Sequence, residues 1–181
     1  MRATDDQPSR DRRVALIGMR GSGKTTVGRL LADRIAAAFV DTDQAVVAAA
    51  GRSISEIFDD EGEAGFRALE RAIVADLIFR SPTVVSVGGG AVLDAGIVEW
   101  LRHHATVVWL TAPPDVLWSR IKADPSTAAW RPRLTGLVGV AEVERLLAER
   151  RQLYRRAAHA AISTDGCTPA QVVDRITAVL P

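Results

Sequence analysis

The chain has 181 residues, of which 48% are hydrophobic and 25% charged, and its formal net charge is +1. This length and composition predict one soluble, well-packed domain and exclude a disordered or fibrous chain. The near-zero charge gives no reason to expect binding to nucleic acid or to a membrane, and a single cysteine, Cys167, excludes an intramolecular disulfide.

Residues 1–13 are rich in charge and lack the apolar core of a signal peptide. They are expected to form a flexible tail ahead of a single domain at 14–181. No later run approaches the length that would span a bilayer. Together with the lack of disulfides, these features predict a cytoplasmic protein.

A phosphate-binding loop follows the first predicted strand, Val14–Ile17. Gly18, Gly23, Lys24 and Thr25 fit the pattern G-x-x-x-x-G-K-[ST]. In this pattern backbone N–H groups surround phosphate oxygens, the lysine contacts the β- and γ-phosphates, and the hydroxyl binds Mg²⁺. An apolar strand before the loop and a helical pattern after it are the context that the motif requires. The sequence therefore predicts a nucleotide site here.

A short run at 38–43 ends in two acids, Asp41 and Asp43, and predicts a second strand that carries them at its carboxyl end. In a strand the two carboxylates would point to the same side. One of them could then complete a Mg²⁺ shell while the other meets a substrate. Aspartate is also favoured just before a helix, which is expected at 44–50, so helix capping is the alternative. The spacing alone favours neither interpretation.

A capping box at Ser53–Glu56 opens the next helix, and a longer helix is expected at 63–80. Arg67 and Glu70 lie three residues apart on this helix and are therefore neighbours. A surface ion pair between them is the simplest structural interpretation of these two charges.

Three glycines, Gly88, Gly89 and Gly90, follow the apolar strand expected at 83–87. They cost chain entropy and allow the backbone to approach another group closely. A structural turn would need only one or two glycines, so the triplet favours a substrate-facing loop.

The remaining segments alternate in the same way. Helices are expected at 94–103, from Pro113, at 140–158 and from Thr168, and strands at 106–110 and 160–163. The stretch 123–139 has prolines and small residues without a period, and its length is typical of a mobile lid. It carries Arg131 and Arg133.

Alternating strands and helices predict an α/β fold, in which a parallel sheet is flanked by helices. Ligands of such sheets bind beyond the carboxyl ends of the strands. The phosphate-binding loop, the acid pair and the glycine triplet each follow a strand, so we expect them to meet at one site.

Six motifs occur in order between Ala15 and Arg156: GMRGSGKTT, DTD, FRALE, GGGAV, RPRL and ERRQLYRR. Together they resemble the shikimate kinase family. The resemblance implies a P-loop kinase fold, with a five-stranded parallel sheet flanked by helices and a mobile lid. It also implies an enzyme that uses Mg²⁺ and transfers the γ-phosphoryl group of ATP to the 3-hydroxyl of shikimate, on the route to aromatic amino acids.

The resemblance further implies which residues bind the nucleotide and the metal. The ATP phosphates would be bound by the loop residues Gly21, Ser22, Gly23, Lys24, Thr25 and Thr26. Thr25 would ligate Mg²⁺ directly and Asp41 through water. Arg120 would stack on the adenine, and Arg131 would move with the lid to the transferring phosphate. Lys24, Asp43 and Arg131 would be the catalytic residues.

For shikimate, the resemblance implies a pocket built from several segments. Arg67 and Arg150 would bind the carboxylate. Asp43 would accept hydrogen bonds from the hydroxyls, either as a positioning group alone or also as the base for the attacking one. The glycines at 88–90 would contact the substrate, and a second tier of residues would line or brace the pocket: Phe58, Phe66 and Glu70.

Two features depart from the family pattern. The lid segment at 121–130 looks longer than in compact members, so Arg133 is a rival to Arg131 for the phosphate contact. Gln152 stands where proline is frequent, which a helix accommodates easily.

Two other functions are compatible with parts of the sequence. A gluconate kinase would share the phosphate-binding loop and the acids, but its acids are typically followed by His-Pro, whereas Gln44 and Ala45 follow Asp43 here. A nucleotide-binding regulatory protein would have lost acceptor groups that this chain retains. A monomer that binds a small molecule, and neither nucleic acid nor a membrane, is expected.

Overall fold

The computed structural model describes residues 13–78, 83–124 and 139–181, and only the backbone of 77 and 78. Its strands are β1 (Arg13–Ile17), β2 (Ala38–Asp41), β3 (Thr83–Ser86), β4 (Thr106–Thr111) and β5 (Ala160–Ser163). They form one sheet in the order β2-β3-β1-β4-β5, and every neighbouring pair is parallel. The predicted α/β class with a five-stranded parallel sheet is therefore confirmed.

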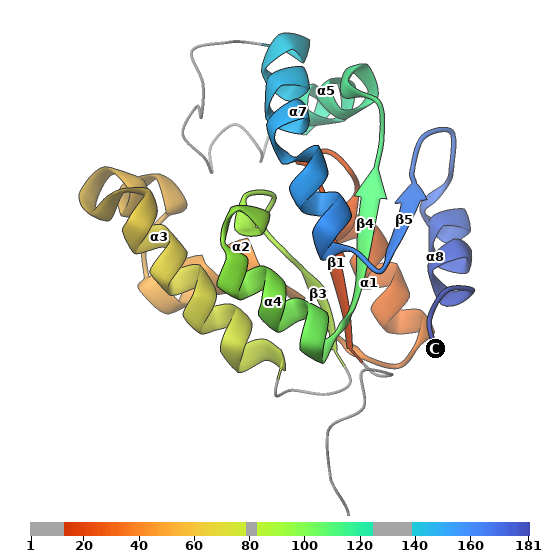
Figure 1. Ribbon diagram of the computed structural model, residues 1–181, viewed down its shortest axis with the longest axis horizontal. Coiled ribbons are helices and arrows are strands. Elements are labelled where there is room, and N and C mark those ends of the chain that lie inside the picture. The colour runs from red at the N-terminus through yellow and green to blue at the C-terminus, as the bar shows by residue number, and fades with distance from the viewer. Residues whose placement is uncertain (1–12, 79–82, 125–138) are drawn as a thin grey trace, which may run out of the picture.

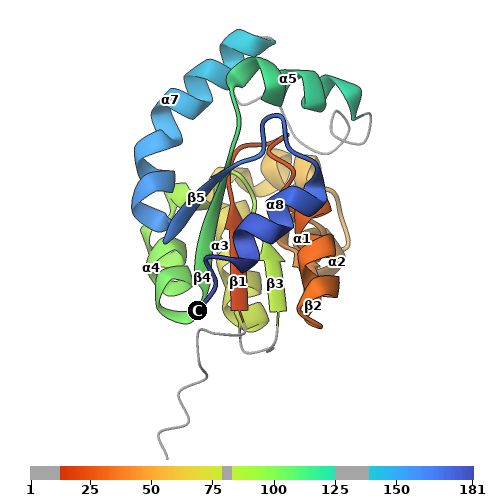
Figure 2. The same ribbon diagram turned by 90° about the vertical axis from the view of Figure 1, so that its right-hand side faces the viewer.

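Helices connect the strands and cover both faces of the sheet (Figures 1 and 2). They are α1 (Lys24–Arg34), α2 (Thr42–Ala50), α3 (Ile54–Ile78), α4 (Ala95–His104), α5 (Pro114–Ala123), α7 (Val140–Ala157) and α8 (Pro169–Thr177), with a 3₁₀ turn, η2, at Ala91–Leu93. Buried side chains of α1 and α8 pack on one face, and those of α3, α4 and α7 on the other.

Alternate residues of the central strand β1 point to opposite faces of the sheet. Ala15 and Ile17 join the core cluster shared with α4 and α7, whereas Val14 and Leu16 join the cluster shared with α1 and α8. Both faces of this strand are buried. This is why the sequence shows a continuous apolar run here instead of an alternating one.

The predicted starts of the first strand and of the long helix were wrong. Strand β1 begins at Arg13, which is 3% exposed, so this residue belongs to the sheet and not to the predicted tail. Residues 1–12 of that tail lie outside the described residues. The helix expected at 63–80 is part of α3, which starts at Ile54 and bends at Gly62, where φ is 69°. The Ser53–Glu56 capping box is present at its start.

The predicted lid at 123–139 is described only at its ends. Helix α5 continues through Ala123 and helix α7 begins at Val140. Residues 125–138, which include Arg131 and Arg133, lie outside the described part of the chain. In the part that is described, no helix combines the length and the apolar character needed to cross a bilayer.

Candidate active site

A pocket of about 630 Å³ lies beyond the carboxyl ends of β1, β2 and β3. It is lined by residues from all three predicted loops, namely the phosphate-binding loop, the acid pair and the glycine triplet. The predicted site residues in its described lining are Gly21, Gly23, Lys24, Thr25, Thr26, Asp41, Asp43, Gly89 and Arg120. The expectation that the three loops meet at one site is therefore confirmed.

The phosphate-binding loop owes its tight path to two glycines. Gly18 and Gly21 have φ values of 144° and 77°. An added Cβ at Gly18 would lie 2.5 Å from the Leu110 carbonyl oxygen, and one at Gly21 would lie 2.6 Å from that of Leu117. A side chain at either position would collide with backbone, so the loop packs directly on β4 and α5. Helix α1 then begins at Lys24, with its first turn at the pocket.

The charge of Lys24 lies over this loop. Its Nζ donates to the carbonyl oxygens of Gly18, at 2.9 Å, and of Met19, at 3.0 Å. An ammonium group beside a glycine loop and a helix N-terminus is the arrangement that binds phosphate in proteins. Ser22, by contrast, is fully buried and is not part of the described lining.

Asp41 caps a helix and also contacts the phosphate-binding loop. Its Oδ1 accepts a hydrogen bond from the backbone N–H of Asp43 at 3.1 Å, and its Oδ2 accepts one from the Thr25 hydroxyl at 2.9 Å. The prediction that both acids stand in a strand was wrong, because β2 ends at Asp41 and Asp43 lies in the first turn of α2. The cap starts the helix at Thr42, so the alternation of a strand no longer applies.

Thr42 is a buried residue of the site to which the sequence had assigned no role. Its side chain is fully buried, and its Oγ1 accepts a hydrogen bond from the backbone N–H of Gly88 at 2.9 Å. This bond joins the start of α2 to the glycine triplet after the neighbouring strand β3. A buried hydroxyl group needs a hydrogen-bond partner, but no pattern in the sequence indicated that Thr42 would be buried.

The glycine triplet admits an arginine from α3. Gly89 lines the pocket, while Gly88 and Gly90 are buried outside its described lining. A Cβ on Gly90 would collide with Nη2 of Arg67 where that group now lies. Glycine at position 90 therefore leaves room for the guanidinium group against the backbone.

Helix α7 brings Arg150 and Tyr154 to the same loop from the other side. The Gly89 carbonyl oxygen accepts a hydrogen bond from the Tyr154 hydroxyl at 2.5 Å and from Arg150 Nη1 at 3.4 Å. Both side chains are buried. Tyr154, which was not predicted as a site residue, thus positions the loop.

The two arginines lie just behind the pocket wall. Arg67 and Arg150 are not in the described lining themselves, but each contacts the glycine triplet, and Gly89 is part of that lining. Within the described residues the buried Nε atoms of both side chains have no hydrogen-bond partner. Two guanidinium groups with unused donors therefore converge on one edge of the pocket.

Arg67 forms the predicted ion pair with Glu70, but the pair is not on the surface, as the sequence had suggested. The Glu70 side chain is fully buried and that of Arg67 is 14% exposed. Nη2 of Arg67 also contacts Glu63 at 3.2 Å. The guanidinium carbon lies 5.2 Å from the centroid of the Phe66 ring, and Phe58 packs on that ring at 5.0 Å between centroids. Phe66 and Glu70 therefore hold Arg67 in place.

Arg120 lies on the side of the pocket opposite the acids. Its Nη1 donates to the Thr164 hydroxyl at 2.9 Å and to the Gly21 carbonyl oxygen at 3.4 Å, and its Nη2 donates to the Thr164 carbonyl oxygen at 2.9 Å. It thereby bridges the phosphate-binding loop and the turn after β5.

The pocket also has lining residues that the sequence had not predicted. They are Arg20, Gln44, Ile54, Ser86, Val87 and Asp124.

Known proteins with similar sequences match almost the whole chain. The family model described as shikimate kinase matches residues 20–181. The chain is 43% identical over 163 residues to a shikimate kinase of Symbiobacterium thermophilum, and the match covers 90% of this chain and 92% of that protein. It is 40% identical over 179 residues to a shikimate kinase of Microcystis aeruginosa, and the match covers 99% of this chain and 92% of that protein.

Solved structures give the same grouping. Shikimate kinase from Acinetobacter baumannii in complex with shikimate has a TM-score of 0.84 at 34% identity, covering 92% of this chain and 90% of that one. A gluconokinase from Sinorhizobium meliloti has a TM-score of 0.55 at 20% identity, which shows a shared fold only. On the family model and these relatives, the chain belongs to the shikimate kinase family.

Proposed function

We propose that the protein transfers the γ-phosphoryl group of ATP to the 3-hydroxyl of shikimate, which yields ADP and 3-phosphoshikimate for aromatic amino acid synthesis. The observation that carries the proposal is the convergence of Arg67 and Arg150 on the glycine edge of a phosphate-binding pocket. A relative from Acinetobacter baumannii binds shikimate, whose carboxylate would fit between two guanidinium forks.

The nucleotide would lie along the loop and the start of α1. Gly21, Gly23 and Thr26 line the pocket at the positive end of that helix, and Ser22 is buried within the same loop. The backbone N–H groups of these four residues would bind the phosphates, with Lys24 supplying the charge. Arg120, held between Gly21 and Thr164, would face the adenine ring.

A Mg²⁺ ion fits the oxygen atoms that Thr25 and Asp41 present to the pocket, 2.9 Å apart. The described residues contain no cluster of three or more His, Cys, Asp or Glu that could hold a metal. Magnesium in nucleotide sites needs only one or two protein ligands besides phosphates and water. When bound, it would neutralise charge on the β- and γ-phosphates. Thr25 would hold it directly and Asp41 through water.

The acceptor would be oriented by the side of the pocket that faces the nucleotide. Arg67 and Arg150 would bind the carboxylate, while Asp43, in the first turn of α2, would accept a hydrogen bond from the attacking hydroxyl. Phosphoryl transfer depends mainly on this positioning and on cations near the transferred group. Glu70 would brace Arg67 through their ion pair, and the aromatic pair Phe58 and Phe66 would support the same helix. The glycines at 88–90 would give the substrate close access to the backbone.

Arg131 would complete the set of cations by moving in with the lid, which would also exclude water from the transferred group. Arg133 is the rival for this contact, and both residues lie outside the described part of the chain. Single substitutions to alanine would rank them. Arg131→Ala should lower kcat more than Arg133→Ala, and the opposite ranking would assign the contact to Arg133.

One chain supplies both the phosphate-binding loop and the two arginines, so we propose that the enzyme acts as a monomer. The lone cysteine, Cys167, is free in the structure and suits a reducing cytoplasm. Light scattering at working concentration should give the mass of one chain. A stable dimer would contradict this part of the proposal.

A substrate panel tests the activity itself. Shikimate, quinate, gluconate and nucleoside monophosphates would each be supplied with ATP and Mg²⁺, and ADP release measured against an acceptor-free background. We expect saturable turnover with shikimate alone. Turnover with gluconate instead would favour the other kinase, and ATP binding without transfer to any acceptor would favour a regulatory protein.

A further inference from the structure

A second pocket of about 650 Å³ lies against β4 and β5, on the face of the sheet that α7 covers only in part. Figure 1 looks onto this face, with β4 and β5 between α7 and α8. We refer to it as the β5 groove, and define it by the side chains that its argument uses: Met19, Trp109, Leu117, Leu147, Arg151 and Arg155. None of the residues that carry the proposed phosphoryl transfer lines it in the described chain.

The groove exists because β5 carries small side chains opposite a large one. Trp109 of β4 is in register with Ala161 of β5, and Thr111 with Ser163. Ala161 and Ser163 are exposed and too small to cover the indole. The Trp109 ring stacks on Tyr154, with centroids 5.6 Å apart and planes 16° from parallel. The groove thus offers a flat aromatic floor, with the apolar walls Leu117 and Leu147 beside it.

The rim of the groove is cationic. Arg151 and Arg155 are exposed residues one turn apart on α7, and both line the groove. Neither forms an ion pair within the described residues, whereas Arg145 on the same helix is paired with Glu149 at 3.0 Å. No Asp or Glu stands in the described lining. Two like charges at this spacing repel each other, and an anion bound between them would relieve that repulsion.

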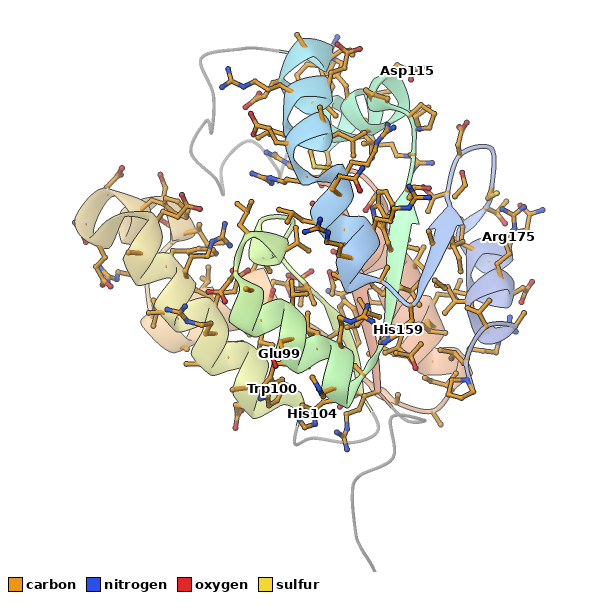
Figure 3. The ribbon with its side chains drawn as sticks, in the orientation of Figure 1. Glu99, Trp100, His104, Asp115, His159 and Arg175 are labelled. Carbon is orange, nitrogen blue, oxygen red and sulfur yellow. The ribbon has the colours of Figure 1, made fainter. Side chains whose placement is uncertain are left out.

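A third polar group lies at the lower end of the groove, where α7 connects to β5 (Figure 3). The Nδ1 atom of His159 accepts a hydrogen bond from the backbone N–H of Val107 at 2.9 Å. In that tautomer the proton is on Nε2, which makes this nitrogen a donor. The groove therefore combines donors and positive charge with an aromatic floor.

The β5 groove also touches both halves of the active site. Met19 is one of the residues that line the groove, and its carbonyl oxygen accepts a hydrogen bond from Lys24. Trp109 stacks on Tyr154, whose hydroxyl is bonded to Gly89 in the pocket wall. A molecule resting on Trp109 and Met19 would therefore contact residues that position the nucleotide and the acceptor.

We propose that the β5 groove is a second ligand site, which binds a small aromatic carboxylate and is coupled to the active site through Met19 and Tyr154. The ring would lie on Trp109 and the carboxylate would bind Arg151 and Arg155. A bare inorganic anion would leave the apolar walls unused. The site is separate from the acceptor pocket, and binding to it does not depend on which acceptor the kinase phosphorylates. Only the KM readout of the coupling rests on the proposed function.

Calorimetric titration with 1-naphthoate tests the binding. Saturating shikimate would be present throughout, so that the acceptor pocket is closed to the probe. We expect one molecule to bind per chain, and 1-naphthalenemethanol, its neutral analogue, to bind at least tenfold more weakly. No measurable binding of naphthoate, or equal binding of the two probes, would overturn the proposal.

Two variants locate the site. The double variant Arg151→Gln/Arg155→Gln should weaken naphthoate at least tenfold, while the matched pair Arg145→Gln/Arg156→Gln, which removes the same charge from the same helix, should leave it unchanged. Ala161→Leu should block both probes by covering Trp109. Unchanged affinity in the first double variant, or in Ala161→Leu, would place the probe elsewhere and overturn the proposal.

The coupling has its own readout. Saturating naphthoate should change the KM for shikimate at least threefold in the wild-type protein. It should also change the Kd for shikimate by the same factor by which shikimate changes the Kd for naphthoate, measured by titration with and without the other ligand. Both effects should disappear in Ala161→Leu, whose KM without naphthoate should be that of the wild type. An unchanged KM would refute the coupling, and an effect that persists in Ala161→Leu would mean that naphthoate competes at the acceptor pocket.

Discussion

The two halves of the active site are built in opposite ways. The nucleotide half is one continuous segment, in which a strand, a glycine loop and the first turn of α1 follow each other in the chain. The acceptor half joins Arg67 of α3, Gly89 after β3 and Arg150 of α7, and the last two are 61 residues apart. The first half is specified by local backbone geometry, and the second by the packing of helices on the sheet.

The halves also differ in how their charges are held. Lys24 is held by two backbone carbonyl oxygens of its own loop. Arg67 is held by the fully buried carboxylate of Glu70 and by the ring of Phe66. Removing one partner of a buried ion pair typically costs about 3–5 kcal/mol, because it leaves the other charge without compensation. Substitutions in the acceptor half should therefore affect folding as well as binding, whereas those in the nucleotide half should affect activity alone.

The largest effect is expected from Lys24→Ala. Loss of this charge should lower kcat by at least about 10²–10³-fold, because no other described side chain holds an ammonium group over the loop. The melting temperature should stay within a few degrees. Steady-state kinetics and thermal unfolding measure the two quantities.

Lys122→Ala provides the matched control, since this lysine is exposed on α5 and is not in the described pocket lining. Its kinetics should be those of the wild-type protein. Near-normal turnover of Lys24→Ala would remove this residue from the mechanism.

Arg67→Lys should test the acceptor half with a smaller effect. An ammonium group cannot reproduce a guanidinium fork, so kcat/KM for shikimate should fall about 10–100-fold, or roughly 1.4–2.8 kcal/mol. The KM for ATP should change much less. Arg71→Lys, on the exposed side of the same helix, is the control. Equal losses for both substrates in Arg67→Lys would mean that the acceptor pocket lies elsewhere.

Thr42→Val tests the bond that joins the acid pair to the glycine triplet. Valine keeps the shape but leaves the buried N–H of Gly88 without its acceptor, which should cost about 1–3 kcal/mol of unfolding free energy. Denaturant unfolding measures this loss. Thr42→Ser keeps the hydroxyl and should recover most of the stability. If valine and serine were equally stable, the bond would not contribute.

The smallest effect is expected at the start of α3. The Ser53 side chain and backbone hydrogen-bond to the carboxylate of Glu56 and hold the pKa of this carboxyl below its ordinary value of 4.5. Because the folded state has the lower pKa, the contribution is present above about pH 4.5 and is lost as the pH falls through the lowered value. Ser53→Ala should raise the Glu56 pKa in an NMR titration. An unchanged titration would show that the cap does not control it.

Local patterns in the sequence were sufficient for the nucleotide half and for the number and order of the strands, although not for all of their ends. Gly18 to Thr25 could be predicted because the motif and its flanking strand and helix are contiguous. The predicted position of Asp43 in a strand was wrong, because Asp41 ends β2 and caps a helix that begins at the next residue. A periodic pattern does not show whether an aspartate at the end of a strand continues the strand or caps a helix.

Other features depended on neighbours that are distant in the chain. The Arg67–Glu70 pair could be predicted from spacing, but its burial could not, because the residues that cover it come from elsewhere. Thr42 and Tyr154 carried no motif. Their partners are backbone groups of Gly88 and Gly89, which reach them only when β2, β3 and α7 are assembled.

By itself, the sequence determined the α/β class, the family resemblance and the phosphate-binding loop. Each motif and each strand or helix pattern is encoded in neighbouring residues, and the class and the resemblance need only the order of these patterns along the chain. Only the tertiary structure decided that Arg67 and Arg150 meet at the glycine triplet and that a groove opens beside β5. The physical reason is the parallel sheet with the order β2-β3-β1-β4-β5. It brings segments distant in sequence together beyond the carboxyl ends of the central strands, and it leaves β5 with its small side chains as an outermost strand.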